Sequence, residues 1–259
     1  MLGAIKSRIA SGLSPDQREA AKHLLRGLKL YRPRPEQLYL EAVVEASPST
    51  FLIQIGANDG LDFVRSVVRR QGRRHRIEGV LVEPQRYFHQ QLVRNYAGLG
   101  GFEIVNLAIS DSARSMTLYH VDYDNTAVPG WAKGLGSFSR DVLMSHAHLI
   151  PDLESVIRSV EVQCISVGDL AAMAGERELD VLITDTEGHD YVILGQFDFA
   201  RIRPKLVVFE SKHLSAGDLS ACEAMLAGHG YQVVHLGNDN SVALRGDIAE
   251  ATQRAVAAA

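Results

Sequence analysis

Short apolar runs alternate with helix-like patterns along the chain from residue 50 onward. The runs 51–55, 79–83, 102–106, 180–184 and 205–210 consist largely of Val, Ile, Leu and Phe, and each ends at polar residues or glycine. Runs of this length are typical of strands buried on both faces of a sheet. Between them, apolar residues recur every three or four positions, as on one face of a helix. This order predicts a doubly wound α/β sheet that is mostly parallel.

Two further helices are predicted before this alternation. The first spans residues 16–30, with Ser14 as N-cap and Pro15 at the first helical position, and the second follows Pro35 and ends before Ser47. Near the other end, an alanine-rich tail is expected to fray. The predicted division is a helical extension (1–48), a main domain (49–248) and a frayed tail (249–259).

The last part of the main domain departs from the parallel pattern. A helix is predicted over 215–228, with Asp218 at the third position of a capping box. Two strands, 231–236 and 241–244, follow it and are separated by the turn sequence GNDN. Such a sequence is typical of a β-hairpin. We therefore expect the sheet to end in an antiparallel hairpin.

Composition excludes several classes of protein. The 259 residues are 46% hydrophobic and 22% charged, which is typical of a globular protein. The net charge of −4 argues against a nucleic-acid partner. No apolar run reaches the roughly 18 residues of a membrane span, and the first eight residues lack the apolar part of a signal peptide. With only Cys164 and Cys222, no disulfide framework is indicated, so a cytoplasmic location is expected. The sequence does not indicate an oligomeric state.

One basic run interrupts the otherwise mixed charge pattern. Residues 69–76 contain five arginines and lie between a predicted helix and a predicted strand. A patch that binds phosphate or lipid is one interpretation. We favour a solvated turn, because charge runs between elements usually face water.

Polar residues follow the first two strands of the predicted sheet. Gly56, Ala57, Asn58, Asp59 and Gly60 come directly after the first strand, and Glu83 ends the second. In an open α/β sheet, ligands bind beyond the carboxyl ends of the strands, and an acidic residue in this place accepts hydrogen bonds from ribose hydroxyls. The sequence therefore predicts a nucleoside pocket. The glycine spacing matches neither G-x-G-x-x-G nor a P-loop, which makes NAD and ATP less favoured.

Four ordered motifs resemble those of one family. Segments 55–60 (IGANDG), 82–84 (VEP), 106–111 (NLAISD) and 185–195 (DTEGHDYVILG) are similar to the motif set of FkbM-family S-adenosylmethionine-dependent methyltransferases. The similarity covers about residues 50–212. In the family, the fourth motif usually resembles I-D-V-E-G-x-E, whereas this chain has Thr186 and ends the motif at Asp190.

The resemblance implies a Rossmann-like methyltransferase sheet whose last strand is inserted antiparallel, with S-adenosyl-L-methionine as cofactor. It also implies O-methylation of a saccharide or natural-product hydroxyl, so the expected partner is a small-molecule or glycan acceptor. Gly56, Ala57 and Asn58 would surround the methionine part, Glu83 would bind the ribose, and Asn106 and Ala108 would lie beside the adenine. The implied cofactor site comprises these residues with Asp59, Gly60 and Asp185.

Methylation of a hydroxyl requires a group that removes its proton. Asp185 and Glu210 end adjacent strands of the expected sheet, with His189 and His213 close to them in sequence, so these four residues are the catalytic candidates. In the alternative interpretation, Asp185 and Glu187 only cap the following helix. Asp185, Glu210 and His213 have side chains that can bind a divalent metal. The resemblance does not require a metal, and none is predicted.

The segment 122–140 shows no clear period and contains three glycines, Trp131 and Phe138. A connection of this length is usually a binding loop or a lid, and we expect it to close over the acceptor. Its aromatic residues either stack on a sugar or anchor an ordinary surface loop. Two other functions remain open from the sequence: a nicotinamide-dependent oxidoreductase and a non-catalytic nucleoside-binding scaffold.

Overall fold

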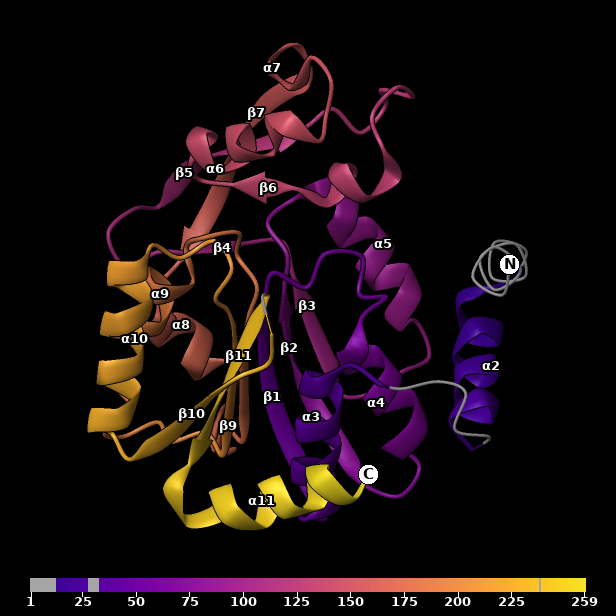
Figure 1. Cartoon of the computed structure of the whole chain (residues 1–259), viewed down its shortest axis with the longest axis vertical. Helices are drawn as coiled ribbons and strands as arrows, with labels where there is room; N and C mark the ends of the chain where they lie inside the picture. The colour runs from indigo at the N-terminus through magenta and orange to yellow at the C-terminus, as the bar shows by residue number, and fades with distance from the viewer. Residues whose placement is uncertain (1–12, 28–32, 238) are drawn as a thin grey trace.

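The central feature of the computed structural model, which describes residues 13–27, 33–237 and 239–259, is a seven-stranded sheet (Figure 1). Its order is β10–β11–β9–β8–β1–β2–β3. The strands are β1 (Ser49–Ile55), β2 (Arg76–Val82), β3 (Phe102–Val105), β8 (Val181–Thr184), β9 (Leu206–Glu210), β10 (Tyr231–His235) and β11 (Asn240–Arg245). All neighbours are parallel except β11, which is antiparallel to both β9 and β10. The predicted doubly wound sheet and its C-terminal hairpin are confirmed.

Helices cover both faces of this sheet, which is why its strands are apolar on both sides. In β1, Phe51 and Ile53 belong to one buried cluster and Leu52 to the other, because successive strand residues point to opposite faces. One face carries α3 (Pro35–Glu45), α4 (Phe63–Gln71), α5 (Arg86–Tyr96) and α11 (Gly246–Ala258), and the other α8 (Val167–Ala172), α9 (Asp190–Leu194) and α10 (Ala216–Gly228). At α10, the predicted cap is present: Ser215 Oγ accepts a hydrogen bond from the Asp218 N–H at 3.1 Å.

Both ends of the chain differ from the predicted division. Leu40 of α3 is fully buried in the same cluster as the sheet, so this helix is part of the main domain rather than of an extension. The tail expected to fray belongs to α11, where Ala249 is fully buried in that cluster. An apolar face of α3 and one of α11 both pack on the sheet, and local composition alone does not reveal this packing.

Helix α2 (Pro15–Gly27) stands beside α4 at the edge of the molecule (Figure 1). Its predicted N-cap is present, since Ser14 Oγ accepts a hydrogen bond from the Gln17 N–H at 3.2 Å. Asp16 links α2 to α4 through ion pairs with Arg65 and Arg69, at 2.8 and 2.7 Å. The predicted continuation of this helix to residue 30, the first eight residues and Asn238 of the hairpin turn lie outside the described residues.

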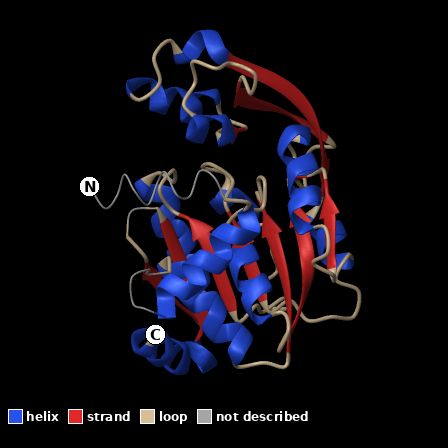
Figure 2. Cartoon of the chain, turned by 90° about the vertical axis from the view of Figure 1, so that its right-hand side faces the viewer, coloured by secondary structure: helices blue, strands red, loops and turns tan. Residues whose placement is uncertain are grey.

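A second, four-stranded sheet rises above the main domain (Figure 2). Its order is β4–β7–β5–β6, with β4 (Ala108–Ile109), β5 (Ser115–Val121), β6 (Gly136–Ser137) and β7 (Ile157–Ile165). Short helices lie between β5 and β7: η1 (Gly130–Gly134), α6 (Arg140–Met144), η2 (Ser145–His148) and α7 (Leu153–Val156). We call residues 115–165 the upper lobe. The segment 122–140, expected to be irregular, thus contains a turn of helix and a short strand, and Ala132 within it is fully buried in a small core of the lobe.

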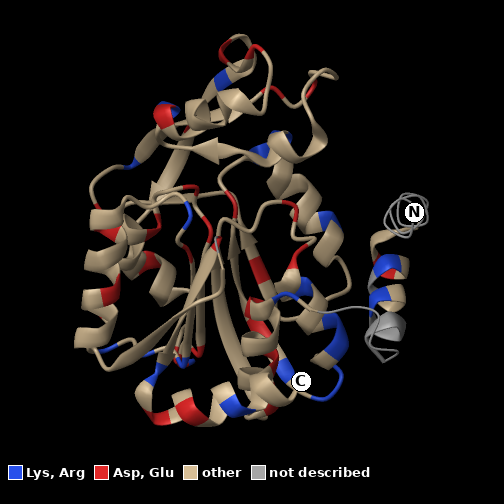
Figure 3. Ribbon diagram, viewed as in Figure 1, with Lys and Arg blue, Asp and Glu red and all other residues tan. Residues whose placement is uncertain are grey.

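Side chains of the basic run form ion pairs. Arg70 pairs with Glu41 and Arg76 with Glu78, in addition to the contact of Arg69 with Asp16. In Figure 3, the blue that marks Lys and Arg is concentrated on the ribbon at the lower end of α4. Within the described ranges, no helix has the length and apolar character needed to cross a membrane.

Candidate functional site

The candidate site lies where the chain order in the sheet reverses, between β1 and β8. The Asp185 N–H, just after β8, donates a hydrogen bond to the Ile55 carbonyl of β1 at 3.0 Å. Gly56 follows β1 with a φ of +83°, and a Cβ atom on it would lie 1.8 Å from the Asp185 carbonyl oxygen. Only glycine allows this approach. The two strand ends therefore form one wall at the place where α/β sheets bind ligands.

Glu83 fixes the loop after β1 to the end of β2. Its two carboxylate oxygens accept hydrogen bonds from the backbone N–H groups of Asn58 and Gln85, both at 2.8 Å. The residue is only 3% exposed, and burial raises the pKa of its carboxyl to about 7. Each carboxylate oxygen has a further lone pair. Glu83 can therefore hold the loop and still accept a hydrogen bond from a ligand.

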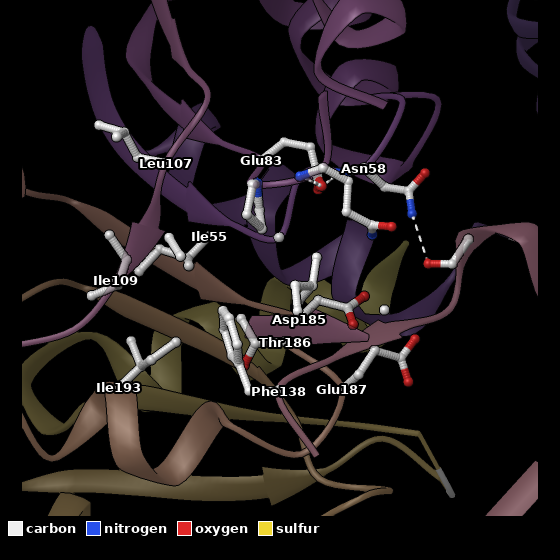
Figure 4. A pocket seen from close by; sticks show the side chains of 17 residues that line it. Ile55, Asn58, Glu83, Leu107, Ile109, Phe138, Asp185, Thr186, Glu187 and Ile193 are labelled. Carbon is white, nitrogen blue, oxygen red and sulfur yellow. Dashed lines mark hydrogen bonds between the residues drawn. The ribbon is translucent and has the colours of Figure 1, made fainter. Parts of the chain in front are cut away.

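A cavity that contains about 660 Å³ of space, part of it open to solvent, extends from these strand ends. Its apolar side chains are those of Ile55, Pro84, Leu107, Ala108, Ile109, Leu118, Phe138 and Ile193, and its polar side chains are those of Asn58, Glu83, Gln85, Asp185, Thr186 and Glu187. In Figure 4, Leu107, Ile109 and Ile193 lie at one end, away from Asn58 and Glu187. The cavity therefore has an apolar end and a polar end.

The upper lobe supplies another side of the cavity through Gly134, Gly136 and Phe138. Asn58 Nδ2 donates a hydrogen bond to the Gly134 carbonyl at 3.3 Å, marked by a dashed line in Figure 4. A Cβ atom on Gly136 would lie 2.5 Å from Gln85 Nε2, so a larger residue would displace that side chain. The expected lid segment does line the site. Its closure stays a prediction, and Trp131 is 54% exposed and outside the cavity lining.

The carboxyl groups of Asp185, Glu187 and Glu210 and the imidazole of His213 gather at the ends of β8 and β9. His213 Nε2 lies 3.2 Å from Glu187 Oε2 and 3.6 Å from Glu210 Oε1. Burial raises the pKa of Glu187 to about 7 and that of Glu210 to about 10, and neighbouring carboxylates add to both shifts. Burial lowers the pKa of His213 to about 4. The positive charge of Lys212 offsets only part of the raised pKa values of Glu187 and Glu210.

Asp185 has a different environment from the other carboxylates. Asp185 is exposed, but it is exposed to the cavity rather than to the outer surface. Protein therefore surrounds its side chain on most sides. This enclosure, with Glu187 and Asp190 as negatively charged neighbours, raises the pKa of Asp185 well above its usual value. Asp185 is therefore the member of the cluster best placed to meet a ligand in the cavity.

The turn after β8 is held by Asp190, not by Asp185 or Glu187. Asp190 is fully buried and accepts hydrogen bonds from the Thr186 N–H and hydroxyl, at 3.2 and 2.8 Å. Glu187 has a φ of +50°, in the left-handed region that L-residues rarely adopt. This geometry gives no support to the interpretation that Asp185 and Glu187 only cap α9.

The predicted cofactor residues divide into two groups. Gly56, Asn58, Glu83, Ala108 and Asp185 line the cavity, whereas Ala57, Asp59, Gly60 and Asn106 are not among its lining residues. The second group shapes the loops: Asp59 Oδ1 accepts a hydrogen bond from the Leu61 N–H at 2.9 Å, and Asn106 Nδ2 donates to the Glu83 and Pro84 carbonyls at 2.8 and 2.9 Å.

Of the catalytic candidates, Asp185 lines the cavity and Glu210 and His213 stand beside it with Glu187. His189 lies at the start of α9, against the Phe138 ring with a centroid distance of 5.5 Å. Sequence reasoning missed Glu187 and Gln85 as site residues. Gln85 lies close after the second strand and Glu187 lies within the fourth motif, and both positions are usable signals.

The fold and the site together define a Rossmann-like methyltransferase: a doubly wound sheet with an inserted antiparallel last strand, and an acidic residue after the second strand. The model of the methyltransferase FkbM domain matches residues 54–233. The chain belongs to the FkbM methyltransferase family, which confirms the predicted family and its cofactor, S-adenosylmethionine. This membership excludes the nicotinamide-dependent oxidoreductase as an interpretation.

Several solved structures, two of them named as methyltransferases, match the chain over most of its length at low sequence identity. Cofactor-bound Rv0187 from MTB has 13% identity and a TM-score of 0.47, with 95% of this chain and 96% of that chain covered. Precorrin-6y C5,15-methyltransferase from Geobacter metallireducens has 10% identity and a TM-score of 0.41, with 82% and 87% covered. A putative class I methyltransferase from Listeria monocytogenes has 9% identity and a TM-score of 0.43, with 92% and 71% covered. No curated protein matches the chain.

Proposed function

We propose that the protein transfers a methyl group from S-adenosylmethionine to a hydroxyl of a saccharide or natural product, with Asp185 as the base. The observation that carries this proposal is the position of Asp185: its carboxylate follows β8, lines the cavity and is open to it. The polar residues Glu83, directly after β2, and Asn58, in the loop after β1, line the same cavity. A donor and an acceptor can thus meet between these walls.

The cavity fits the chemical parts of S-adenosylmethionine. The apolar end formed by Leu107, Ala108 and Ile109 suits the adenine ring. Glu83 has lone pairs for the ribose hydroxyls, and the loop at Gly56 and Asn58 offers backbone and amide groups to the methionine part. When bound, S-adenosylmethionine supplies an electrophilic methyl carbon, whose bond to sulfur breaks with the electron pair kept on sulfur while the acceptor oxygen bonds to that carbon.

The residues of this chain then have two tasks, to orient the acceptor and to receive its proton. In the proposal, the proton of the acceptor hydroxyl passes to a carboxylate oxygen of Asp185, since the hydroxyl is a weak nucleophile until it loses that proton. Glu187 is in reach of a second hydroxyl, and Phe138 offers an aromatic surface on the cavity wall. An acceptor with several hydroxyl groups suits this lining.

The proposed base is tested by Asp185→Asn, which keeps the shape of the side chain but cannot take the proton. We expect product formation, measured by mass spectrometry with a panel of glycans and hydroxylated natural products, to fall by about 10²–10⁴-fold. Binding of S-adenosylhomocysteine should change by no more than a few fold. The exposed Asp141 of α6 provides the control Asp141→Asn, with expected wild-type turnover.

Equal product formation by wild type and Asp185→Asn would remove Asp185 as the base. If the wild type binds S-adenosylhomocysteine but methylates no member of the panel, the alternative of a non-catalytic nucleoside-binding scaffold gains support.

A further inference from the structure

Glu187, Glu210 and His213 come from three different positions of the chain and present their polar atoms to one point. One ligand atom from each lies within 4.8 Å of the others. Across the part of the chain that the structure describes, no other group of three His, Cys, Asp or Glu residues meets this condition. Since β8 and β9 are neighbours in the sheet, the fold itself brings these residues together.

The separations of His213 from the two glutamates are close to those in the coordination sphere of a small cation. Two ligands bonded to one cation at about 2.1 Å, at an angle of roughly 90–109°, lie about 3.0–3.4 Å apart. His213 Nε2 is 3.2 Å from Glu187 Oε2 and 3.6 Å from Glu210 Oε1. A cation between them thus requires only small side-chain movements.

The burial of Glu210 points to a ligand independently of this spacing. The residue is only 8% exposed, and its Oε2 atom is buried without a hydrogen-bond partner among the described residues. A buried carboxylate oxygen without a donor is costly. The neighbouring basic residue Lys212 is half exposed and extends to Asp239, at 3.9 Å. A positive charge at the cluster would therefore stabilise Glu210 directly.

We propose that Glu187, Glu210 and His213 bind one divalent cation of the Mn²⁺ type in the wall of the cavity. Two carboxylates with one imidazole form a mainly hard ligand set, which suits manganese. Glu187 also lines the cavity (Figure 4), so the cation stands at its edge. The remaining coordination positions can take an acceptor oxygen, and a cation there favours loss of the hydroxyl proton. The binding site itself does not depend on the identity of the acceptor.

The proposal is tested by titrating the purified, chelator-treated protein with Mn²⁺ and measuring free Mn²⁺ by electron paramagnetic resonance. We expect one saturable site per chain, with affinity weakened by at least about tenfold in both His213→Ala and Glu210→Gln. His235→Ala is a matched control, because His235 Nε2 also lies 3.2 Å from a glutamate, Glu223, but away from the cavity. This control should bind Mn²⁺ as the wild type does.

Absence of a saturable Mn²⁺ site in the wild type, or wild-type affinity in both His213→Ala and Glu210→Gln, would overturn the proposal. S-adenosylhomocysteine binding, measured in the same samples, shows that each variant is folded. It also separates the two proposals: binding of S-adenosylhomocysteine without Mn²⁺ refutes only the cation site, and Mn²⁺ binding without S-adenosylhomocysteine refutes only the proposed function.

Discussion

Glu83 combines burial with a negative charge, and this combination makes the stability of the ligand-free protein depend on pH. Because burial raises the pKa of Glu83 from 4.5 to about 7, folding favours the protonated form. The contribution to stability is fully present below about pH 4.5 and is lost as the pH rises through 7.

The first prediction compares wild type with Glu83→Gln, which cannot titrate. Between pH 4.5 and 8, the free energy of unfolding of the wild type should fall relative to that of Glu83→Gln, by up to about 3 kcal/mol. Urea unfolding at several pH values measures this difference. Glu103→Gln, at an exposed position of β3, is the control. A difference between wild type and Glu83→Gln that stays constant over this range would contradict the assigned environment.

Gly56 lets β1 and β8 approach each other. Glycine is needed there for two reasons, its positive φ and the lack of space for a Cβ atom, and a comparison with Gly98 separates the two. Gly56 and Gly98 have nearly the same φ, +83° and +85°, but only at Gly56 would a Cβ atom collide with other atoms. Gly98→Ala should therefore cost about 1–2 kcal/mol of stability from backbone strain. Gly56→Ala should cost about 3 kcal/mol or more, because overlap with Asp185 is added. Thermal unfolding of the two variants checks this order, and equal losses would refute the close approach.

At the scale of elements, α11 provides a clear test, because the sequence predicts a frayed tail and the structure has a packed helix. Ala249 is fully buried against the main core, and Ala251 on the same helix is exposed. Ala249→Asp buries an unpaired charge and should lower the free energy of unfolding by about 2–4 kcal/mol. Ala251→Asp should cost less than about 1 kcal/mol. If both variants are equally stable in denaturant titrations, the tail is frayed after all.

Elements with a strong local pattern could be predicted from the sequence, and the pairing of strands that lie far apart along the chain could not. The runs of β1, β2, β8 and β9 are apolar because helices cover both faces, and this pattern is local. In the upper lobe, β5 pairs with β7 across a register that joins Ser115 to Gln163, and neither strand is buried on both faces. Their partners lie too far along the chain for periodicity to identify them.

The same distinction holds in the site. Gly56 and Glu83 follow strands directly, so position in the sequence was sufficient to find them. Phe138 was a candidate from the irregular segment 122–140, and it does line the cavity, from the other lobe. The left-handed backbone that brings Glu187 to the cluster could not be predicted from the sequence.

At the scale of the whole molecule, two lobes enclose one cavity. The main domain contributes the strand ends with Gly56, Glu83 and Asp185, and the upper lobe contributes Gly134 and Phe138. The hydrogen bond from Asn58 to Gly134 joins the two lobes across the site. In the proposed function, the methyl donor binds between the lobes and the acceptor binds at the cluster at the ends of β8 and β9.

Calorimetric titration with S-adenosylhomocysteine tests the central claim, that this cavity is the cofactor site. We predict binding by the wild type in the micromolar to low-millimolar range, weakened by about 1–3 kcal/mol in Glu83→Ala because the ribose hydroxyls lose an acceptor. Glu103→Ala should bind as the wild type does, and thermal unfolding shows whether each variant is folded. A wild type that does not bind S-adenosylhomocysteine, or a folded Glu83→Ala with wild-type affinity, would contradict the account.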